Sequence, residues 1–198
     1  MKMRYYLSMF VILLFVLSGC ALKEAPPMNY YSLHISKMPV VKHSKYANKV
    51  LKVSYPKPLT EKLTDKIRFS YSISDRGVYQ NSQWANTLEK LIEGNIITAL
   101  QQSRLFKAVL PYSSTAGGDL RLESMIYDFS HHVRGDASYA VVSMEFALID
   151  IHTGALIKTK RFSYREDTVT TDAKGYVEAS NKILHRLGVD LIHWLKSS

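Results

Sequence analysis

Three strand-like segments follow one another in the second half of the chain, and the middle one alternates apolar and polar residues; this pattern constrains the fold more than any other feature. They span 119–131, 137–151 and 155–165, and only short connections separate them. Such alternation is typical of strands with one buried face, and short connections join antiparallel neighbours. We therefore predict three strands in close succession, with a tight hairpin turn at His152-Thr153-Gly154 between the last two. The apolar face of the middle strand consists of Ala140, Val142, Met144, Phe146 and Leu148.

Two longer segments carry apolar residues at spacings of three and four, which is typical of amphipathic helices. The first runs from Trp84 to Leu100, and Asn81-Ser82 before it supplies helix-capping side chains. The second begins near Asp172, another capping residue, and continues to Lys196. Its apolar stripe consists of Tyr176, Ser180, Ile183, Leu187, Leu191 and Trp194.

Shorter segments complete the predicted sheet, and none of them forms an internal repeat or an interdomain linker. We predict strands at 30–35, 50–55, 66–74, 78–80 and 105–109, and a loop over the basic stretch 36–49. Strands and helices that alternate without βαβ periodicity indicate an α+β fold. The expected architecture is a single domain with a mostly antiparallel or mixed sheet and two long helices packed on one face.

Composition favours an ordinary globular domain. Charged residues make up 22% of the 198 residues and aromatic residues 11%, which is enough apolar material to offset the entropy lost on folding. The single cysteine, Cys20, excludes a disulfide scaffold and any zinc site built from cysteines.

The first twenty residues resemble a lipoprotein signal. Lys2 and Arg4 precede an uncharged run over 5–17, which is too short to span the hydrocarbon core of about 30 Å. The run ends in Leu17-Ser18-Gly19-Cys20, which resembles the bacterial lipobox. We therefore expect cleavage between Gly19 and Cys20, with a diacylglycerol and an N-acyl chain on Cys20 as the membrane anchor.

This interpretation divides the chain into three parts. Residues 1–19 are the signal peptide, 20–29 are the lipidated N-terminus and tether with Pro26-Pro27, and 30–198 are the folded domain. In Gram-negative lipoproteins an Asp after the cysteine favours the inner membrane. Ala21-Leu22 stands there instead, which favours a periplasm-facing position at the outer membrane.

Motifs for catalysis and metal binding are missing from the sequence. There is no Gly-x-Ser-x-Gly, phosphate-loop or His-Glu-x-x-His pattern, so we expect no enzyme activity and no cofactor. His131 and His132 are adjacent and would point to opposite faces of a strand. His185 and His193 are more than two helical turns apart, so we predict no metal site.

Two surface questions stay open at the level of the sequence. The basic stretch 37–52 either faces an anionic membrane or acidic partner, or is a solvated loop; we expect no nucleic-acid binding. The apolar residues Trp84, Leu88 and Trp194 are either core residues or part of a surface that binds lipid or a partner.

The chain as a whole resembles the ABC-type transport auxiliary lipoprotein family, the group that includes paraquat-inducible protein C. The resemblance rests on the order of short motifs from the lipobox to the last helix. These motifs are Cys20, Tyr30-Tyr31-Ser32-Leu33, the strand 50–56, 67–71, Tyr79, Trp84-Ala85-x-x-Leu88, Leu100-x-x-Ser103-x-Leu105-Phe106, Asp119-Leu120-x-Leu122, 148–154 and Trp194-Leu195.

The resemblance implies an accessory role in intermembrane lipid transport. Its implied partners are an ABC permease and ATPase and a periplasmic protein of the mammalian-cell-entry type, whose lipid conduit the lipoprotein docks or receives. Some family members form homo-oligomeric rings. The alternative is a lipoprotein subunit of another envelope assembly, such as one for lipopolysaccharide placement or secretion. A periplasmic hydrolase is a third class, but it would need a nucleophile and a base that the sequence does not reveal.

Overall fold

The computed structural model describes residues 26–59, 64–72 and 74–197, and these form one α+β domain with a mixed nine-stranded sheet. The elements are β1 (Asn29–Tyr31), β2 (Val50–Val53), β3 (Lys57–Pro58), β4 (Lys66–Ser70), β5 (Arg76–Trp84), α2 (Leu88–Ser103), β6 (Ala108–Pro111), β7 (Leu120–Arg134), β8 (Ala137–Asp150), β9 (Leu156–Asp167) and α3 (Ala173–Lys196). None of the described helices is both long enough and apolar enough to cross a membrane.

The long strand β7 organises the sheet. Along one edge it pairs antiparallel with β8, which pairs antiparallel with β9, so the three predicted strands and the hairpin between the last two are confirmed. Along the other edge it pairs in parallel with three short strands in succession: β2 at 120–122, β3 at 125–126 and β4 at 131–132. The remaining strands extend this second side, because β6 pairs with β2, β5 with β4, and β1 with β5.

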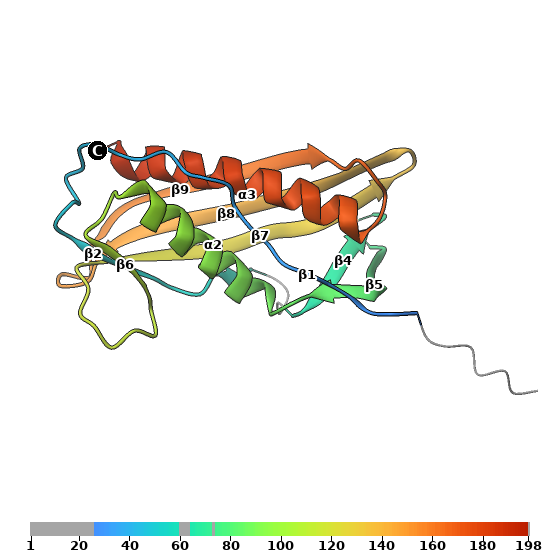
Figure 1. Cartoon of the computed structure of the whole chain (residues 1–198), viewed down its shortest axis with the longest axis horizontal. Coiled ribbons are helices and arrows are strands. Elements are labelled where there is room, and N and C mark those ends of the chain that lie inside the picture. The colour runs from blue at the N-terminus through green and yellow to red at the C-terminus, as the bar shows by residue number, and fades with distance from the viewer. Residues whose placement is uncertain (1–25, 60–63, 73, 198) are drawn as a thin grey trace, which may run out of the picture.

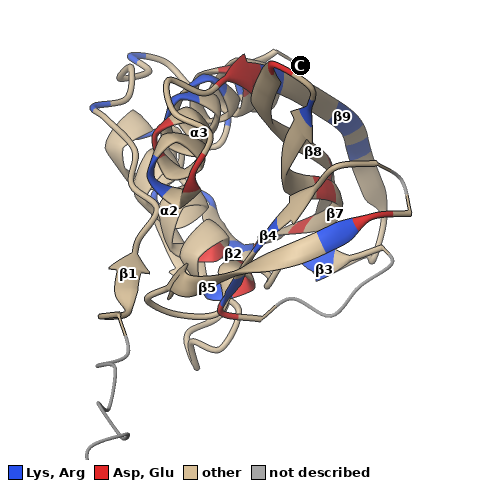
Figure 2. Cartoon of the chain, turned by 90° about the vertical axis from the view of Figure 1, so that its right-hand side faces the viewer, with Lys and Arg blue, Asp and Glu red and all other residues tan. Residues whose placement is uncertain are grey.

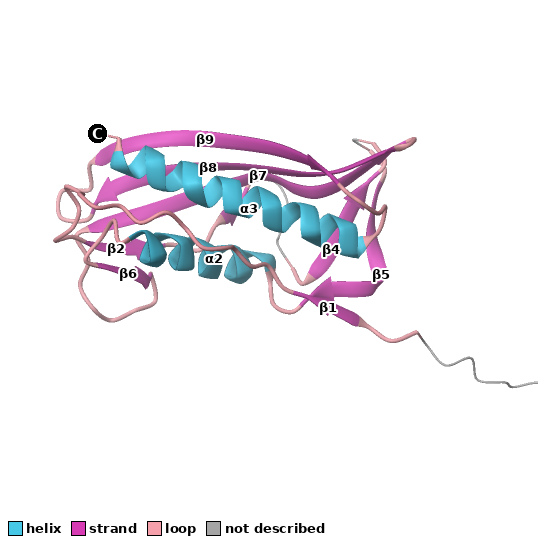
Figure 3. Ribbon diagram, turned by 45° about the horizontal axis from the view of Figure 1, so that its top comes forward, coloured by secondary structure: helices cyan, strands magenta, loops and turns pink. Residues whose placement is uncertain are grey.

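Both helices cover the same face of the sheet, as the sequence predicts (Figures 1 and 3). Seen from one end, the strands β7, β8 and β9 arc opposite α2 and α3 (Figure 2). The predicted apolar face of β8 is fully buried, and so are Ile183, Leu187 and Leu191 of α3. Burial of these alternating side chains against the helical stripes is the main source of stability for such a layer.

An extra residue in β7 reverses its alternation. Ile126 pairs with Met144 and Asp128 with Ser143, so two residues of β7 oppose one of β8, and Tyr127 is the additional residue. Before this bulge the even-numbered residues of β7 face the helices, whereas after it Phe129 and His131 do so. The bulge therefore places His131 in the interior.

The start of the first helix differs from the prediction. Asn81, Ser82 and Trp84 belong to β5, and α2 begins at Leu88 after Thr87. The backbone of Trp84 remains in the sheet because it pairs with Tyr31 of β1 and donates a hydrogen bond to the carbonyl oxygen of Asp65. Strand pairing thus overrides a residue spacing that also suits a helix.

The second helix begins as predicted. The Asp172 carboxylate accepts a hydrogen bond of 2.8 Å from the Gly175 backbone N–H, which satisfies one free donor of the first turn. This bond holds the pKa of Asp172 below its ordinary value. Position 175 also requires glycine for a steric reason, since a Cβ there would lie 2.2 Å from the carbonyl oxygen of Thr170.

The predicted first strand is shorter than expected, and a long irregular segment follows it. Strand β1 ends at Tyr31, and residues 32–49 cross the molecule without regular pairing. Three buried side chains, Leu33, Met38 and Tyr46, hold this segment against the domain. The predicted strand at 105–109 shifts to β6, and Leu105 and Phe106 pack in the core before it.

Candidate functional site

The predicted anchor residues, Gly19 and Cys20, lie outside the described residues. The described chain begins at Pro26 and enters the domain at β1. Because β1 runs parallel to β5, the residues before it lie towards Arg76, where β5 begins. We call this the entry end of the domain; the C-terminal end of α3 lies at the opposite end (Figure 1).

Trp84, Leu88 and Trp194 lie in the interior, which corrects the alternative that they form a binding surface. The side chain of Trp84 is only 1% exposed and packs against Phe129 and Tyr176. Leu88 and Trp194 are also buried, and the Trp194 ring packs edge-on against Phe162. The apolar stripes of the helices are therefore core, and recognition needs another face of the molecule.

The face of β7, β8 and β9 that points away from the helices is a polar surface with aromatic rings. The guanidinium of Arg161 lies 3.7 Å from the ring centre of Tyr127, and that of Arg165 lies 3.6 Å from that of Tyr139. Arg161 also donates to the hydroxyl of Ser143 on the neighbouring strand. Cation–π contacts of this kind fix the long side chains in place, so the face has a defined chemical pattern.

A groove of about 400 Å³ opens on this same face. Its exposed aromatic rings are Tyr55, which is 43% exposed, and Tyr112, which is 55% exposed. Aromatic rings beside charged groups are typical of binding surfaces, because the rings bury area at low entropic cost. The lining residues are Ser54, Tyr55, Lys57, Tyr112, Arg121, Glu123, Ser124, Met125, Glu145 and Ala147.

This groove does not follow from the amino-acid sequence. Its walls come from the ends of β2 and β6 and its floor from β7 and β8, segments that are far apart in the chain. The one available signal was Glu145, which the alternation of β8 places on the face opposite the core. Tyr55 and Tyr112 carried no such signal, because each follows a short strand in an irregular connection.

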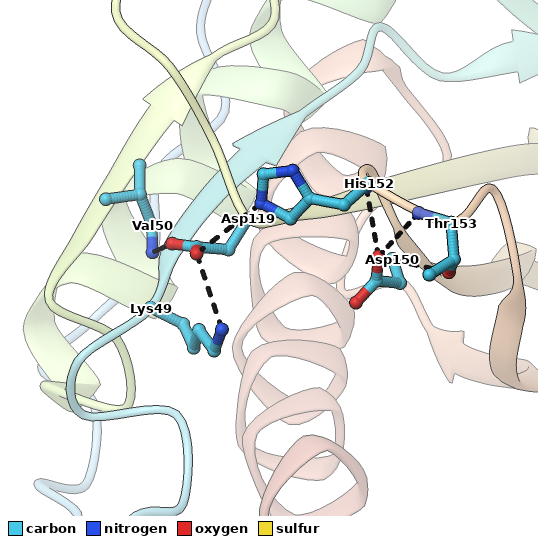
Figure 4. Close-up of polar contacts among 6 residues, drawn as sticks. All are labelled: Lys49, Val50, Asp119, Asp150, His152 and Thr153. Carbon is cyan, nitrogen blue, oxygen red and sulfur yellow. Dashed lines mark hydrogen bonds and ion pairs between the residues drawn. The ribbon is translucent and has the colours of Figure 1, made fainter.

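Asp119 and Asp150 fasten the corner where β2, β7 and the β8–β9 turn meet (Figure 4). Asp119 accepts a hydrogen bond of 2.7 Å from the Val50 backbone N–H and lies 3.4 Å from the ammonium of Lys49. Asp150 accepts from the backbone N–H groups of His152 and Thr153. These bonds lower the pKa of both carboxyl groups.

The turn at this corner is the predicted hairpin. Gly154 has a φ of 72°, which glycine adopts without strain. We infer that Asp119 and Asp150 have a structural role at this corner, because each carboxylate already accepts hydrogen bonds from neighbouring residues.

His131 is the most buried polar side chain on the helix-facing side of the sheet. Its Nδ1 lies 2.7 Å from the Tyr79 hydroxyl and its Nε2 lies 2.8 Å from that of Ser138, and its ring stacks on Tyr176. Burial, aided by the nearby His132, lowers its pKa to about 4, although Asp172 opposes the shift. The imidazole is therefore neutral near pH 7 and serves as a hydrogen-bonding core residue.

His132 lies on the other face of the strand, where it stacks on Tyr139, so the predicted opposite orientation of the two histidines is confirmed. Ser130 and Asp128 lie beside it and have the residue types of a hydrolase triad. Both contact the same nitrogen, however: Nε2 lies 2.9 Å from the Ser130 hydroxyl and 3.2 Å from the Asp128 carboxylate. A triad needs the serine on one ring nitrogen and the carboxylate on the other, so this arrangement does not activate a nucleophile.

Metal-ligating side chains are scattered over the described part of the chain. Nowhere within it do three or more His, Asp or Glu residues gather in a way that could hold an ion. We call the face of β7, β8 and β9 that points away from the helices the open sheet face. It offers charge, hydrogen bonds and aromatic surface, which suit recognition of a partner.

Comparison with known proteins places the chain in a family. The model of the ABC-type transport auxiliary lipoprotein component matches residues 32–191. No curated protein matches the chain in a sequence search.

Solved structures share the fold at low sequence identity. Protein XCC0632 from Xanthomonas campestris is 17% identical with a TM-score of 0.73, and the match covers 84% of this chain and 94% of that one. An uncharacterised protein of known crystal structure is 19% identical with a TM-score of 0.65, and the match covers 86% and 99% of the two chains. The family match covers most of the domain, and the chain belongs to the ABC-type transport auxiliary lipoprotein family.

Proposed function

We propose that this protein is a lipid-anchored accessory component of an ABC-type intermembrane lipid transport system of the mammalian-cell-entry type. The observation that carries the proposal is the family match over 32–191, which extends from just after β1 to the last turns of α3. The anchor is Cys20 with its diacylglycerol and N-acyl chain, and the domain faces the periplasm from the outer membrane. The partners are the permease and ATPase and the periplasmic component that carries lipid between membranes.

In this proposal the open sheet face and its groove bind the periplasmic component. The groove combines two exposed tyrosines with charged groups of both signs, among them Arg121 and Glu123. Such a mixture gives orientation and specificity, whereas the interior apolar stripes are not available to a partner. The proposal includes no catalytic step and no cofactor. It agrees with the shared contact of Ser130 and Asp128 with one nitrogen of His132.

Site-specific crosslinking tests the docking surface. A photo-reactive amino acid at Tyr112, in the groove, should crosslink to the mammalian-cell-entry-type protein in intact cells. The matched control is the same replacement at Val169, which is 78% exposed and lies on the connection before α3. Crosslinks from the control position alone would move the docking surface to the entry end of the domain.

The alternative, a lipoprotein of another envelope assembly, predicts a different product in the same experiment. Mass spectrometry of the crosslinked band would then identify a subunit of lipopolysaccharide placement or of secretion. Isolation of the lipoprotein and the mammalian-cell-entry-type protein without any crosslink from either position would count against the lipid-transport role.

A further inference from the structure

The end of the domain opposite the entry end is basic, and the structure assembles it from four separate parts of the chain. The cations come from the segment 32–49, the α2–β6 connection, the start of β9 and the last turn of α3. We call this surface the basic end. It consists of Lys37, Lys42, Lys45, Lys49, Arg104, Lys107, Lys158 and Lys196.

Backbone contacts bring these parts together. The backbone N–H of Val41 donates to the carbonyl oxygen of Ser103, and that of Lys107 donates to the carbonyl oxygen of Lys49. On the other side, the Lys158 ammonium donates to the carbonyl oxygen of Trp194 and lies over its ring. The segment 32–49 is thus held against the C-terminal end of α2, and the start of β9 is held against the C-terminal end of α3.

The lysines of this segment are displayed by a fixed backbone. Met38 and Tyr46 are buried on either side of Lys42, and the Tyr46 ring stacks on Phe106 with ring centres 5.4 Å apart. The Met38 side chain packs so close to α3 that a Cβ on Gly188 would lie 3.1 Å from its sulfur. Buried anchors that alternate with exposed lysines keep the cations on the outer surface.

Acidic side chains do not balance these cations. Of the four lysines in the segment 32–49, only Lys49 forms an ion pair with a carboxylate of the described residues, that of Asp119. Asp119 and Asp150, the acidic residues of the adjacent corner, already accept backbone hydrogen bonds. Burial and the neighbouring charge of Lys45 lower the pKa of Lys158, which is the expected effect of like charges held close together.

The chemistry of the cations favours a phospholipid surface over a protein. Seven of the eight are lysines, which are depleted at protein interfaces, where arginine is enriched. Lysine clusters displayed at a molecular surface are typical of contacts with anionic lipid headgroups. Exposed aliphatic side chains such as Val40 and Leu156 lie among them and suit the same surface.

We infer that the basic end binds anionic phospholipid in the same membrane leaflet that holds the Cys20 anchor, so that the domain lies along the membrane. This inference rests on the proposed anchor. The chain from 20 to 28 reaches at most about 30 Å, whereas the 24 residues of α3 separate the two ends of the domain by about 36 Å. The tether keeps the entry end close to the leaflet, so the basic end reaches the same leaflet when the domain lies along the membrane. The anchor then supplies a high effective concentration, and weak headgroup contacts suffice.

Energy transfer in vesicles tests this orientation. Cys20 is the sole cysteine and acylation occupies its thiol, so Ala47→Cys introduces one labelling site beside the lysines. The acylated, labelled protein is reconstituted into vesicles that carry an acceptor dye on the lipid. We expect stronger transfer in vesicles of phosphatidylcholine with phosphatidylglycerol than in phosphatidylcholine alone. The difference should vanish at about 1 M salt, where the Debye length falls to about 3 Å.

Charge reversal identifies the residues responsible. The double substitution Lys42→Glu and Lys45→Glu should reduce the transfer to the level seen in neutral vesicles. Lys66→Glu with Lys90→Glu changes the net charge equally at exposed lysines outside the basic end, and it should leave the transfer unchanged. Circular dichroism of both double variants confirms that they fold.

Two outcomes would overturn the inference. One is equal transfer in neutral and anionic vesicles. The other is an equal loss of transfer in both double variants, which would mean that net charge alone is responsible. If the label instead responds to a soluble polyglutamate and not to anionic lipid, the surface recognises an acidic protein. Failure of the proposed anchor is a separate result, because the unsubstituted protein would then lack an acyl mass and would not remain with neutral vesicles.

Discussion

At the scale of single residues, the aromatic side chain at the end of β5 decides between a core and a surface role. Trp84 packs against Phe129 and Tyr176, so Trp84→Ala should lower the free energy of unfolding by about 3–5 kcal/mol. Urea denaturation followed by circular dichroism measures this loss. Val169→Ala, at an exposed position, should stay within about 0.5 kcal/mol of the unsubstituted protein. An equally small loss of unfolding free energy in both variants would contradict a core role for Trp84.

A second residue, His131, makes stability depend on pH. Its pKa is about 4 in the folded protein against an ordinary 6.5, so between these values the unfolded chain binds more protons than the folded one. The contribution of neutral His131 to the free energy of unfolding is therefore fully present above pH 6.5. It declines as the pH falls towards 4, by at most about 3 kcal/mol. Urea midpoints across this range measure the decline.

The pH dependence should belong to this histidine in particular. His131→Gln should flatten the curve between pH 6.5 and 4, although it lowers stability overall. His43→Gln, at an exposed position in the segment 32–49, should leave the slope unchanged. An unaltered slope in His131→Gln would assign the proton uptake to another group.

At the scale of elements, the start of α3 depends on a close approach between helix and connection. A Cβ on Gly175 would lie 2.2 Å from the carbonyl oxygen of Thr170, so Gly175→Ala should destabilise the protein by about 1–3 kcal/mol. Gly94 in α2 is the matched control, because nothing lies within 4 Å of a Cβ there. Gly94→Ala should be neutral or stabilise the helix by up to about 1 kcal/mol. Thermal unfolding should show a lower midpoint for Gly175→Ala and an unchanged or higher midpoint for Gly94→Ala.

Elements were predictable where local pattern and tertiary pairing agree. The strand β8 and the helix α3 follow their periodicity because the same set of positions faces the core along the whole element. The predicted start of α2 was wrong because Trp84 pairs with β1, a contact that the neighbouring residues in the chain do not reveal. The bulge at Tyr127 was also missed, since an extra residue leaves no signature in an alternating pattern.

At the scale of the whole molecule, the proposed anchor on Cys20 would decide where the protein works. Cys20→Ser would remove the thiol that we propose carries the diacylglycerol, so we expect an unprocessed precursor without acyl label. Metabolic labelling with palmitate and fractionation of the envelope measure both effects. Ser18→Ala keeps a small residue in the lipobox and should be processed normally. A Cys20→Ser chain that is cleaved normally and released from the membrane would contradict the lipobox assignment.

The same scale shows why the candidate surfaces could be predicted only in part. The alternation of β8 is enough to place Glu145 on the face of the sheet opposite the core, and the stretch of lysines before β2 is visible in the sequence as a charge cluster. The groove forms because Tyr55 and Tyr112 lie close together beside β7, and the basic end forms because Lys45 lies near Lys158. Neither contact between distant segments can be predicted from residue spacing along the chain.

The amino-acid sequence by itself determined the element types, the α+β class, the expected lipid anchor and the family resemblance. These depend on residue order within short windows, where periodicity and motif spacing act directly. Only the tertiary structure decided that Trp84 and Trp194 are core, that His131 is enclosed, and that the lysines gather at one end. Those outcomes depend on strand register and helix packing between distant segments, and the burial of apolar surface selects such contacts for the chain as a whole.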